Sequence, residues 1–211
     1  MVDEVRAITD AISIPLIADG DTGYGNAINV KRTVRGYYAA GAAGLLLEDQ
    51  VNPKRCGHTR GKSIVSREEA AQRITAAVDA RRELGSEAAD FAIMARTDAA
   101  ACESFEEAVT RCLMFRELGA DITFLEAPRN EDEMREYCKR VPGPKLANML
   151  EQGDTPILPP EVLREMGYTI AAYPLTLMSS AVKAMEVALG ELKSGDPGRV
   201  QPLLKDFAEI R

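Results

Sequence analysis

The chain has few of the residues that mark several classes of protein. Its 211 residues include no tryptophan, a single histidine and only 5% aromatic residues. It has four cysteines without a Cys-x-x-Cys pair, which argues against a zinc knuckle or a disulfide framework and favours a reducing compartment. We therefore expect a cytoplasmic protein, or an organellar one if a targeting segment precedes Met1.

The chain also lacks long apolar runs and clusters of positive charge. No apolar run approaches the ~18 residues that a membrane-spanning helix needs, and the first residues resemble neither a signal core nor a transit segment. Asp plus Glu (33) outnumber Lys plus Arg (26), so the formal net charge is −7. An acidic chain without a basic patch argues against nucleic acid or an anionic membrane as a partner.

What the sequence does contain is a regular alternation of strand-like and helix-like segments. Short runs of branched apolar residues predict strands, and the segments with a helical period predict helices between them. The predicted strands are 14–18, 44–48, 91–96, 122–126, 145–148 and 169–173. The predicted helices are 3–12, 26–40, one that begins at a capping box on Ser66, 104–118, 130–140, 160–166 and 176–193.

Alternating strands and helices imply a parallel sheet, for which two architectures compete. A doubly wound sheet has its site at a switch in strand order, whereas a (β/α)8 barrel has it at the carboxyl ends of many strands. A residue suited to a site ends or directly follows each of the six predicted strands: Asp19 with Asp21, Glu48, Arg96, Glu126, Asn148 and Pro174. This favours a TIM-type barrel over residues 1–211 as a single partial domain. A barrel needs eight strands and about 250 residues, so we expect two strands to be missing at the N-terminal side.

Three acidic residues follow the first two predicted strands. Asp19 and Asp21 are two positions apart, so their side chains point to the same side, and Glu48 ends the neighbouring strand. Three carboxylates brought together repel one another unless a cation lies among them. Such oxygen ligands suit Mg²⁺, with Mn²⁺ as an alternative. The competing interpretation is a capped turn at Asp19–Asp21 and a surface acid at Glu48.

The segment 49–66 is long for a connection between a strand and a helix. About 2–6 residues are usual there, and longer loops are typical of lids and binding segments. Within the segment, Cys56 is flanked by Lys54, Arg55 and His58. Cationic neighbours favour a thiolate and lower a cysteine pKa, so this thiol is a candidate proton donor and acceptor. The alternative is an exposed basic loop with an incidental cysteine.

A third group of candidates ends the central and later strands. A guanidinium at Arg96 can hold a carboxylate or a developing oxyanion through two hydrogen bonds. Glu126 is either part of the site or a structural ion-pair partner of Arg96. Asn148 can donate a hydrogen bond to a substrate oxygen, or it can cap the end of its strand.

Several short motifs resemble the isocitrate lyase/phosphoenolpyruvate mutase superfamily. Residues 54–58 read Lys-Arg-Cys-Gly-His, which matches that family's cysteine signature. Further matching motifs occur in the family's order: Glu48–Gln50, Met94–Asp98, Glu126–Ala127, Ala147–Met149 and Tyr173–Leu175. The resemblance covers nearly the whole chain. It is strongest to the short members: 2-methylisocitrate lyase, dimethylmalate lyase, the petal-death oxaloacetate hydrolase and carboxyvinyl-carboxyphosphonate phosphorylmutase.

This resemblance implies roles for the candidate residues and a reaction. It implies a Mg²⁺ site in which Asp19 is a direct ligand and Asp21 and Glu48 act largely through water. The catalytic residues that it implies are Cys56, Arg96 and His58, and the substrate-binding residues are Lys54, Gly57, Arg96, Glu126, Asn148 and Pro174. The implied reaction cleaves a carbon–carbon bond of a small 2-hydroxy or 2-oxo carboxylic acid, such as methylisocitrate, dimethylmalate or oxaloacetate.

Two features depart from the family pattern and keep two alternatives open. The family's first two strands, with a Ser-Gly substrate loop and a further metal-linked aspartate, have no counterpart here, so one alternative is an inactive truncated scaffold that oligomerises. Ser179 stands where methylisocitrate lyases have an arginine, which favours smaller acids or the P–C chemistry of a carboxyphosphonoenolpyruvate phosphonomutase. The closing helices expected at 176–193 and 202–211 resemble a segment exchanged between subunits, which implies a homotetramer.

Overall fold

A computed structural model describes residues 1–56, 61–195 and 197–206 of the chain. They belong to two compact units, Met1–Ala172 and Tyr173–Arg211. Every strand of the described residues lies in the first unit. The prediction that the whole chain acts as a single domain stays a prediction.

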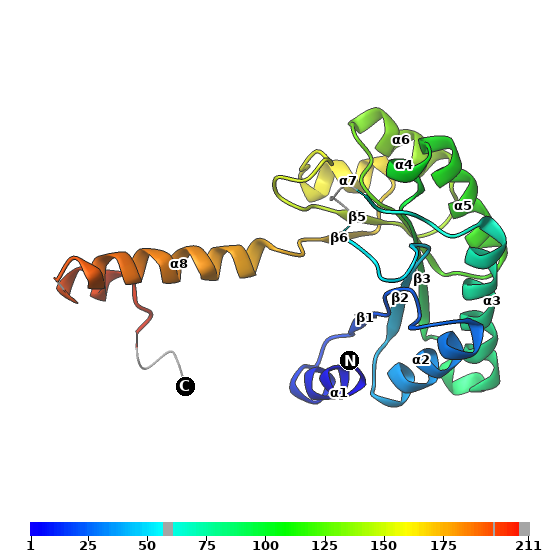
Figure 1. The fold of residues 1–211 in the computed structure, drawn as a ribbon, viewed down its shortest axis with the longest axis horizontal. Coiled ribbons are helices and arrows are strands. Elements are labelled where there is room, and N and C mark those ends of the chain that lie inside the picture. Colours follow the sequence, from blue (N-terminus) through cyan, green and yellow to red (C-terminus); the bar gives the residue numbers. More distant parts are fainter. Residues whose placement is uncertain (57–60, 196, 207–211) are drawn as a thin grey trace. The chain divides into compact units, whose positions relative to one another are not determined.

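The strands of the first unit are all parallel and follow one another in sequence order (Figure 1). β1 (Ile17–Asp19), β2 (Gly44–Glu48), β3 (Ala92–Thr97) and β4 (Ile122–Leu125) form one sheet, and β5 (Leu146–Asn148) pairs with β6 (Ile170–Ala172). A parallel bridge between Thr123 and Lys145 links the two sheets. The predicted α/β class with parallel strands is therefore confirmed, and a switch in strand order does not occur among these strands.

A helix follows most of the strands, as the alternation predicts. The helices of this unit are α1 (Val2–Ala11), α2 (Ala27–Ala39), α3 (Arg67–Glu83), α4 (Ala99–Cys102), α5 (Phe105–Glu117), α6 (Glu131–Arg140) and α7 (Pro160–Met166), with a 3₁₀ turn η1 (Ser86–Ala88). The capping box at Ser66 is only half formed. Its hydroxyl accepts from the Glu69 amide at 3.2 Å, but the Glu69 carboxylate pairs with Arg73 at 2.7 Å instead of returning to the cap.

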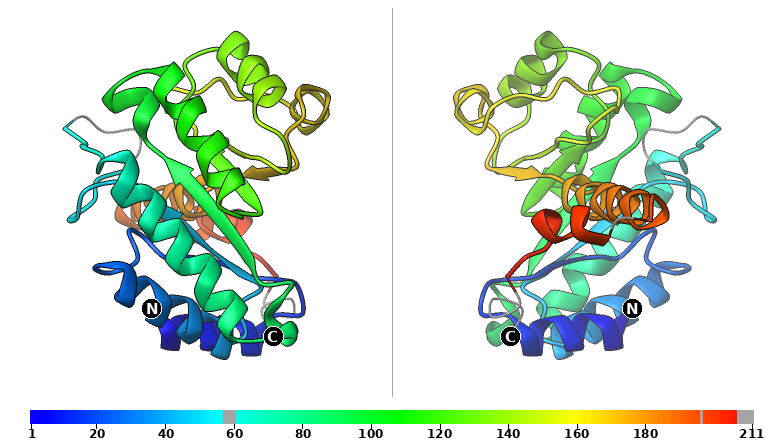
Figure 2. Two further views of the ribbon diagram at one scale, coloured as in Figure 1. Left: turned by 90° about the vertical axis from the view of Figure 1, so that its right-hand side faces the viewer. Right: turned by 90° about the vertical axis from the view of Figure 1, so that its left-hand side faces the viewer.

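Alternate strand residues pack on the two faces of the sheet. Leu45, Leu47 and Ile93 are fully buried beside α2 and α3, which with α5 lie along one face (Figure 2). Leu46, Ala92 and Met94 alternate with these residues along β2 and β3 and belong to a second cluster. All six strands contribute to it: Ile17, Leu46, Ala92, Met94, Ile122, Phe124, Leu146, Ile170 and Ala172. The strands therefore share one apolar face, and their carboxyl ends lie at one edge of it.

The second unit consists mainly of α8 (Thr176–Lys193), which has the predicted bounds, followed by η2 (Pro197–Arg199) and η3 (Gln201–Leu203). The helix predicted over 202–211 is wrong for residues 204–206, which are not helical, while 207–211 lie outside the described residues. A helix as short as the one predicted there is only marginally stable unless it packs on another element. The neighbouring α8 has no buried residue, so it provides no such packing. Among the described residues, no helix has the length and apolar character needed to cross a membrane.

Candidate active site

The turn after β1 brings two aspartates beside the end of β2. The Gly20 amide donates to Leu46 O at 2.8 Å, and the Glu48 amide donates to Asp21 O at 2.9 Å. A Cβ at Gly20 would lie 2.7 Å from the Leu46 oxygen, so this close approach requires glycine. Asp21 adopts a left-handed φ of +48°, and its amide donates to Asp19 Oδ1 at 2.9 Å. The turn thereby aims both carboxylates at the same place.

The three acids predicted as metal ligands meet around one ammonium group. Lys54 Nζ lies 2.5 Å from Asp21 Oδ1, 3.2 Å from Asp19 Oδ2 and 3.7 Å from Glu48 Oε2. Burial lowers the pKa of Lys54, but the neighbouring acids outweigh it and the net shift is upward. In the described parts of the chain, no three acidic, cysteine or histidine side chains already surround a metal-sized position. The space among these acids is taken by the lysine.

Glu48 is the least satisfied member of this group. The residue is 2% exposed, and among the described residues neither carboxylate oxygen accepts a hydrogen bond, although the charges of Lys54 and Arg96 lie near Oε2. Burial raises the pKa of Glu48 to about 7, because the charges of Arg96 and Lys54 only partly offset the loss of solvent. A buried carboxylate without donors is a group that a cation would stabilise.

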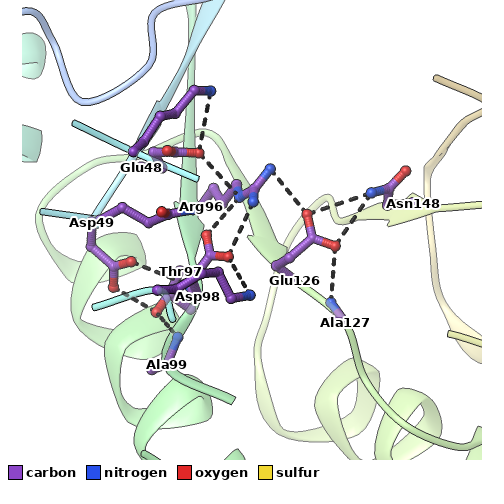
Figure 3. A network of polar contacts seen from close by, with 12 residues as sticks. Glu48, Asp49, Arg96, Thr97, Asp98, Ala99, Glu126, Ala127 and Asn148 are labelled. Atoms are coloured by element: carbon purple, nitrogen blue, oxygen red, sulfur yellow. Dashed lines mark hydrogen bonds and ion pairs between the residues drawn. The ribbon is translucent and has the colours of Figure 1, made fainter. Parts of the chain in front are cut away.

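Arg96 lies at the centre of the second half of the site (Figure 3). It pairs in register with Glu48 across β2 and β3, so the two side chains meet, with 3.3 Å between Nε and Glu48 Oε2. The guanidinium also contacts Asp98 through Nε (2.8 Å) and Nη2 (3.1 Å), and Glu126 Oε2 through Nη1 (3.0 Å). The guanidinium carbon Cζ lies over the ring of Phe124, 5.1 Å from the ring centroid. Burial lowers the pKa of Arg96, but the surrounding carboxylates raise it by more, so the net shift is upward.

Glu126 connects this arginine to β5. Its Oε1 accepts from the Ala127 amide at 3.1 Å, and Asn148 Nδ2 lies 3.3 and 3.4 Å from its two oxygens (Figure 3). Ala127 has a left-handed φ of +55°, which turns the chain away directly after the carboxylate. The expected ion pair of Arg96 with Glu126 is therefore present, and Asn148 is brought to the same place.

A buried layer behind the site consists of residues that we did not predict as functional. Asp49 accepts from Thr97 Oγ1 at 2.6 Å, from the Asp98 amide at 3.0 Å and from Arg111 Nη1 at 3.1 Å. Asp98 could have been found from its position two residues after Arg96, which places both side chains on one side of the strand end. Arg111 gives no such signal, because an arginine within a helix is usually exposed.

The base of the segment 49–66 is held as a short antiparallel ladder. Gln50 bridges Ile64, and the Val51 amide donates to Ser63 O at 2.9 Å. The Gln50 side chain also binds the backbone of Arg55 on both sides, donating to its oxygen and accepting from its amide, each at 2.9 Å. This fixes the chain directly before Cys56, which is exposed.

Three predicted site residues are not described as part of this site. Gly57 and His58 fall outside the described residues. Pro174 belongs to the second unit, in the exposed turn that precedes α8. Of the predicted groups, the structure therefore brings together the three acids with Lys54, and Arg96 with Glu126 and Asn148.

Comparison with known proteins finds relatives that are lyases or a phosphorylmutase by name. The chain is 48% identical to the 2,3-dimethylmalate lyase of Eubacterium barkeri over 93% of this chain and 66% of that protein. It is 48% identical to the 2-methylisocitrate lyase of Aeropyrum pernix (88% and 58%) and 45% identical to the chloroplastic carboxyvinyl-carboxyphosphonate phosphorylmutase of Arabidopsis thaliana (90% and 55%). The chain thus spans between about half and two thirds of the length of these relatives.

Solved structures agree with these relatives. An oxaloacetate acetylhydrolase bound to the inhibitor 3,3-difluorooxalacetate superposes with a TM-score of 0.87 at 37% identity, covering 96% of this chain and 71% of that one. A 2,3-dimethylmalate lyase of the PEP mutase/isocitrate lyase superfamily gives 0.86 at 40% identity (94% and 67%). The family model described as phosphoenolpyruvate phosphomutase matches residues 1–193. The resemblance seen in the sequence is confirmed: the chain belongs to the phosphoenolpyruvate phosphomutase family.

Proposed function

We propose that this chain carries the active site of a Mg²⁺-dependent lyase that cleaves a carbon–carbon bond of a small 2-hydroxy or 2-oxo carboxylic acid. The observation that carries the proposal is the meeting of Asp19, Asp21 and Glu48 around one ammonium group, with Glu48 free of hydrogen bonds among the described residues and 3.3 Å from the guanidinium of Arg96. Relatives named dimethylmalate lyase, methylisocitrate lyase and oxaloacetate acetylhydrolase support the substrate class.

The charges at the strand ends fit a divalent cation. Among the residues that the structure describes, five carboxylates meet three cations there, which is two more negative than positive charges when all are ionised: Asp19, Asp21, Glu48, Asp98 and Glu126 against Lys54, Lys62 and Arg96. Asp19 would hold the ion directly, with Asp21 and Glu48 beside it. When bound, Mg²⁺ (or Mn²⁺) supplies positive charge that polarises a substrate oxygen.

The rest of the site binds and orients an anionic substrate. Arg96 is held from three sides by carboxylates, so its orientation is set before a ligand arrives. We expect it to bind a substrate carboxylate or a developing oxyanion, with Glu126 and Asn148 in contact with the same ligand. Lys54, Gly57, His58 and Pro174 are proposed to complete the site.

Cys56 is proposed as the acid/base. When the carbon–carbon bond breaks, the ionised 2-hydroxyl becomes the carbonyl of a pyruvate- or glyoxylate-like fragment, whose oxygen Arg96 would stabilise. The electron pair of the broken bond goes to the carbon of the other fragment, to which Cys56 Sγ would donate a proton. The exposed thiol on a chain segment fixed by Gln50 supports this role.

We also propose the architecture that this chemistry requires. The apolar face shared by all six strands supports a closed (β/α)8 TIM-type barrel. The many exposed apolar residues of α8, among them Leu177, Met178 and Leu189, support a homotetramer in which this helix is exchanged between subunits.

The test is an assay of the purified chain with 2-methylisocitrate, 2,3-dimethylmalate and oxaloacetate, each with Mg²⁺ and with EDTA. We expect Mg²⁺-dependent cleavage of at least one acid, lost in Cys56→Ala and kept in the matched control Cys102→Ala. Phosphorus NMR of a phosphonate substrate covers the alternative P–C chemistry, which the Arabidopsis relative's name favours. Absence of every turnover would contradict the proposal and favour the inactive scaffold.

A further inference from the structure

A second lysine of the segment 49–66 lies at the edge of the site without taking part in the proposed chemistry. The Lys62 side chain is 4% exposed, and its Nζ lies 2.9 Å from Asp98 Oδ1. A buried ammonium is costly unless it is paired, so this placement is maintained by the ion pair.

Asp98 connects this lysine to the substrate-binding arginine. Its side chain is fully buried, and it holds Arg96 in a two-point contact through Nε and Nη2. Oxygen Oδ1 is shared by Arg96 Nη2 and Lys62 Nζ. Burial raises the pKa of Asp98, but Arg96 and then Lys62 outweigh it, so the net shift is downward.

We propose that Lys62 is a positioning residue that fixes the guanidinium of Arg96 for a carboxylate ligand by holding Asp98. This inference rests on the proposed function, because it assigns a task to a residue one contact removed from the substrate-binding group. Lys62 pins one carboxylate oxygen and offsets part of its charge. Arg96 therefore keeps both its orientation and positive charge that a ligand can use.

The backbone ties this contact to the catalytic segment. Lys62 lies beside the ladder in which Ser63 accepts from Val51 and Ile64 bridges Gln50. Gln50 in turn holds Arg55, the residue before Cys56. One short ladder thus positions both the proposed proton donor and, through Lys62, the proposed anion-binding group.

The experiment compares oxalate binding by the parent chain, Lys62→Met and Lys62→Arg in Mg²⁺, measured by calorimetry. Oxalate serves as a probe with two carboxylates. We expect Lys62→Met to weaken binding about tenfold or more, and Lys62→Arg to restore it to within about threefold. Lys139→Met is the matched control, because that side chain is 80% exposed on α6, and it should bind as the parent does.

Unfolding temperatures separate positioning from a purely structural role. A structural role alone would lower the melting temperature of Lys62→Met and leave oxalate affinity unchanged, which would overturn the inference. If Lys62→Met does not fold, Lys62→Gln, which keeps a hydrogen-bond donor without the charge, gives the same comparison. A parent chain that turns over substrate while Lys62→Met binds oxalate equally well would overturn only this inference. A parent chain without oxalate binding or turnover would overturn the proposed function as well.

Discussion

The two halves of the site solve the problem of buried charge in different ways. At the carboxyl ends of β3 and β4, the side chains of Arg96, Asp98 and Glu126 are almost completely buried, and the two carboxylates share the guanidinium, with Lys62 as a second cation on Asp98. On β1 and β2, Asp19 is half exposed and Glu48 is buried and accepts no hydrogen bond from the described residues, with one lysine among the acids. The arginine half is therefore held by ion pairs among its own side chains, whereas the acidic half has charge left for a cation.

The largest loss of stability should come from removing Arg96, the guanidinium of the arginine half. Arg96→Met leaves three carboxylates without their common partner, and we expect a loss of about 3–5 kcal/mol in the free energy of unfolding. Chemical denaturation at neutral pH measures it. The matched control is Arg82→Met, an exposed arginine on α3 that should change stability little. An equally small change for Arg96→Met would mean that this half is not held together by charge.

In the acidic half, removing a charge should raise the free energy of unfolding instead of lowering it. The folded pKa of Glu48 is about 7, above its ordinary value of 4.5, so the folded chain binds this proton more tightly and loses stability as pH rises from 4.5 to 7. Glu48→Gln should therefore stabilise the metal-free protein above pH 7, by up to about 3 kcal/mol, and have little effect below pH 4.5. Urea denaturation in EDTA across this range measures the difference. Equal stabilisation at every pH would contradict titration of Glu48 as the cause.

Metal binding should depend on the acid with the most direct role. Asp19→Asn removes one negative charge from the proposed ligand set, and we expect Mg²⁺ affinity to fall at least tenfold, or about 1.4 kcal/mol. Calorimetric titration with Mg²⁺ alone checks this. Asp10→Asn, at an exposed position of α1, should bind as the parent chain does. Unchanged affinity in Asp19→Asn would refute the metal assignment.

The smallest effect concerns the lysine that lies among the acids. A bound cation must displace the Lys54 ammonium from Asp21, so Lys54→Met should strengthen Mg²⁺ binding about three- to tenfold, which is about 1 kcal/mol. The same titration measures it, with Lys139→Met as the control for loss of a surface charge. Weaker binding in Lys54→Met would show that the lysine supports the ion instead of competing with it.

Much of this arrangement can be predicted from the sequence because strand periodicity is local. The alternation of side chains fixes which residue ends each strand, so Asp19, Glu48 and Arg96 could be placed at one edge without coordinates. Their mutual distances depend on register, which the alternation of apolar residues also specifies.

The rest of the site could not be predicted because it depends on long-range ion pairs. Lys62 meets Asp98 across 36 positions, and Arg111 meets Asp49 across 62, so neither pair leaves a pattern in any short window. The position of Lys54 was not predicted either. Nothing in the spacing of the residues indicates that its ammonium group lies among the predicted metal ligands.

The two hydrogen bonds between the Gln50 side chain and the Arg55 backbone set a length requirement. A side-chain amide has a fixed reach, and the four residues from 51 to 54 must span that reach while delivering Lys54 to the acids. Their identities can therefore vary more freely than their number. A one-residue deletion or insertion there should break the two hydrogen bonds and shift Cys56 relative to Gln50, even where every named residue is retained.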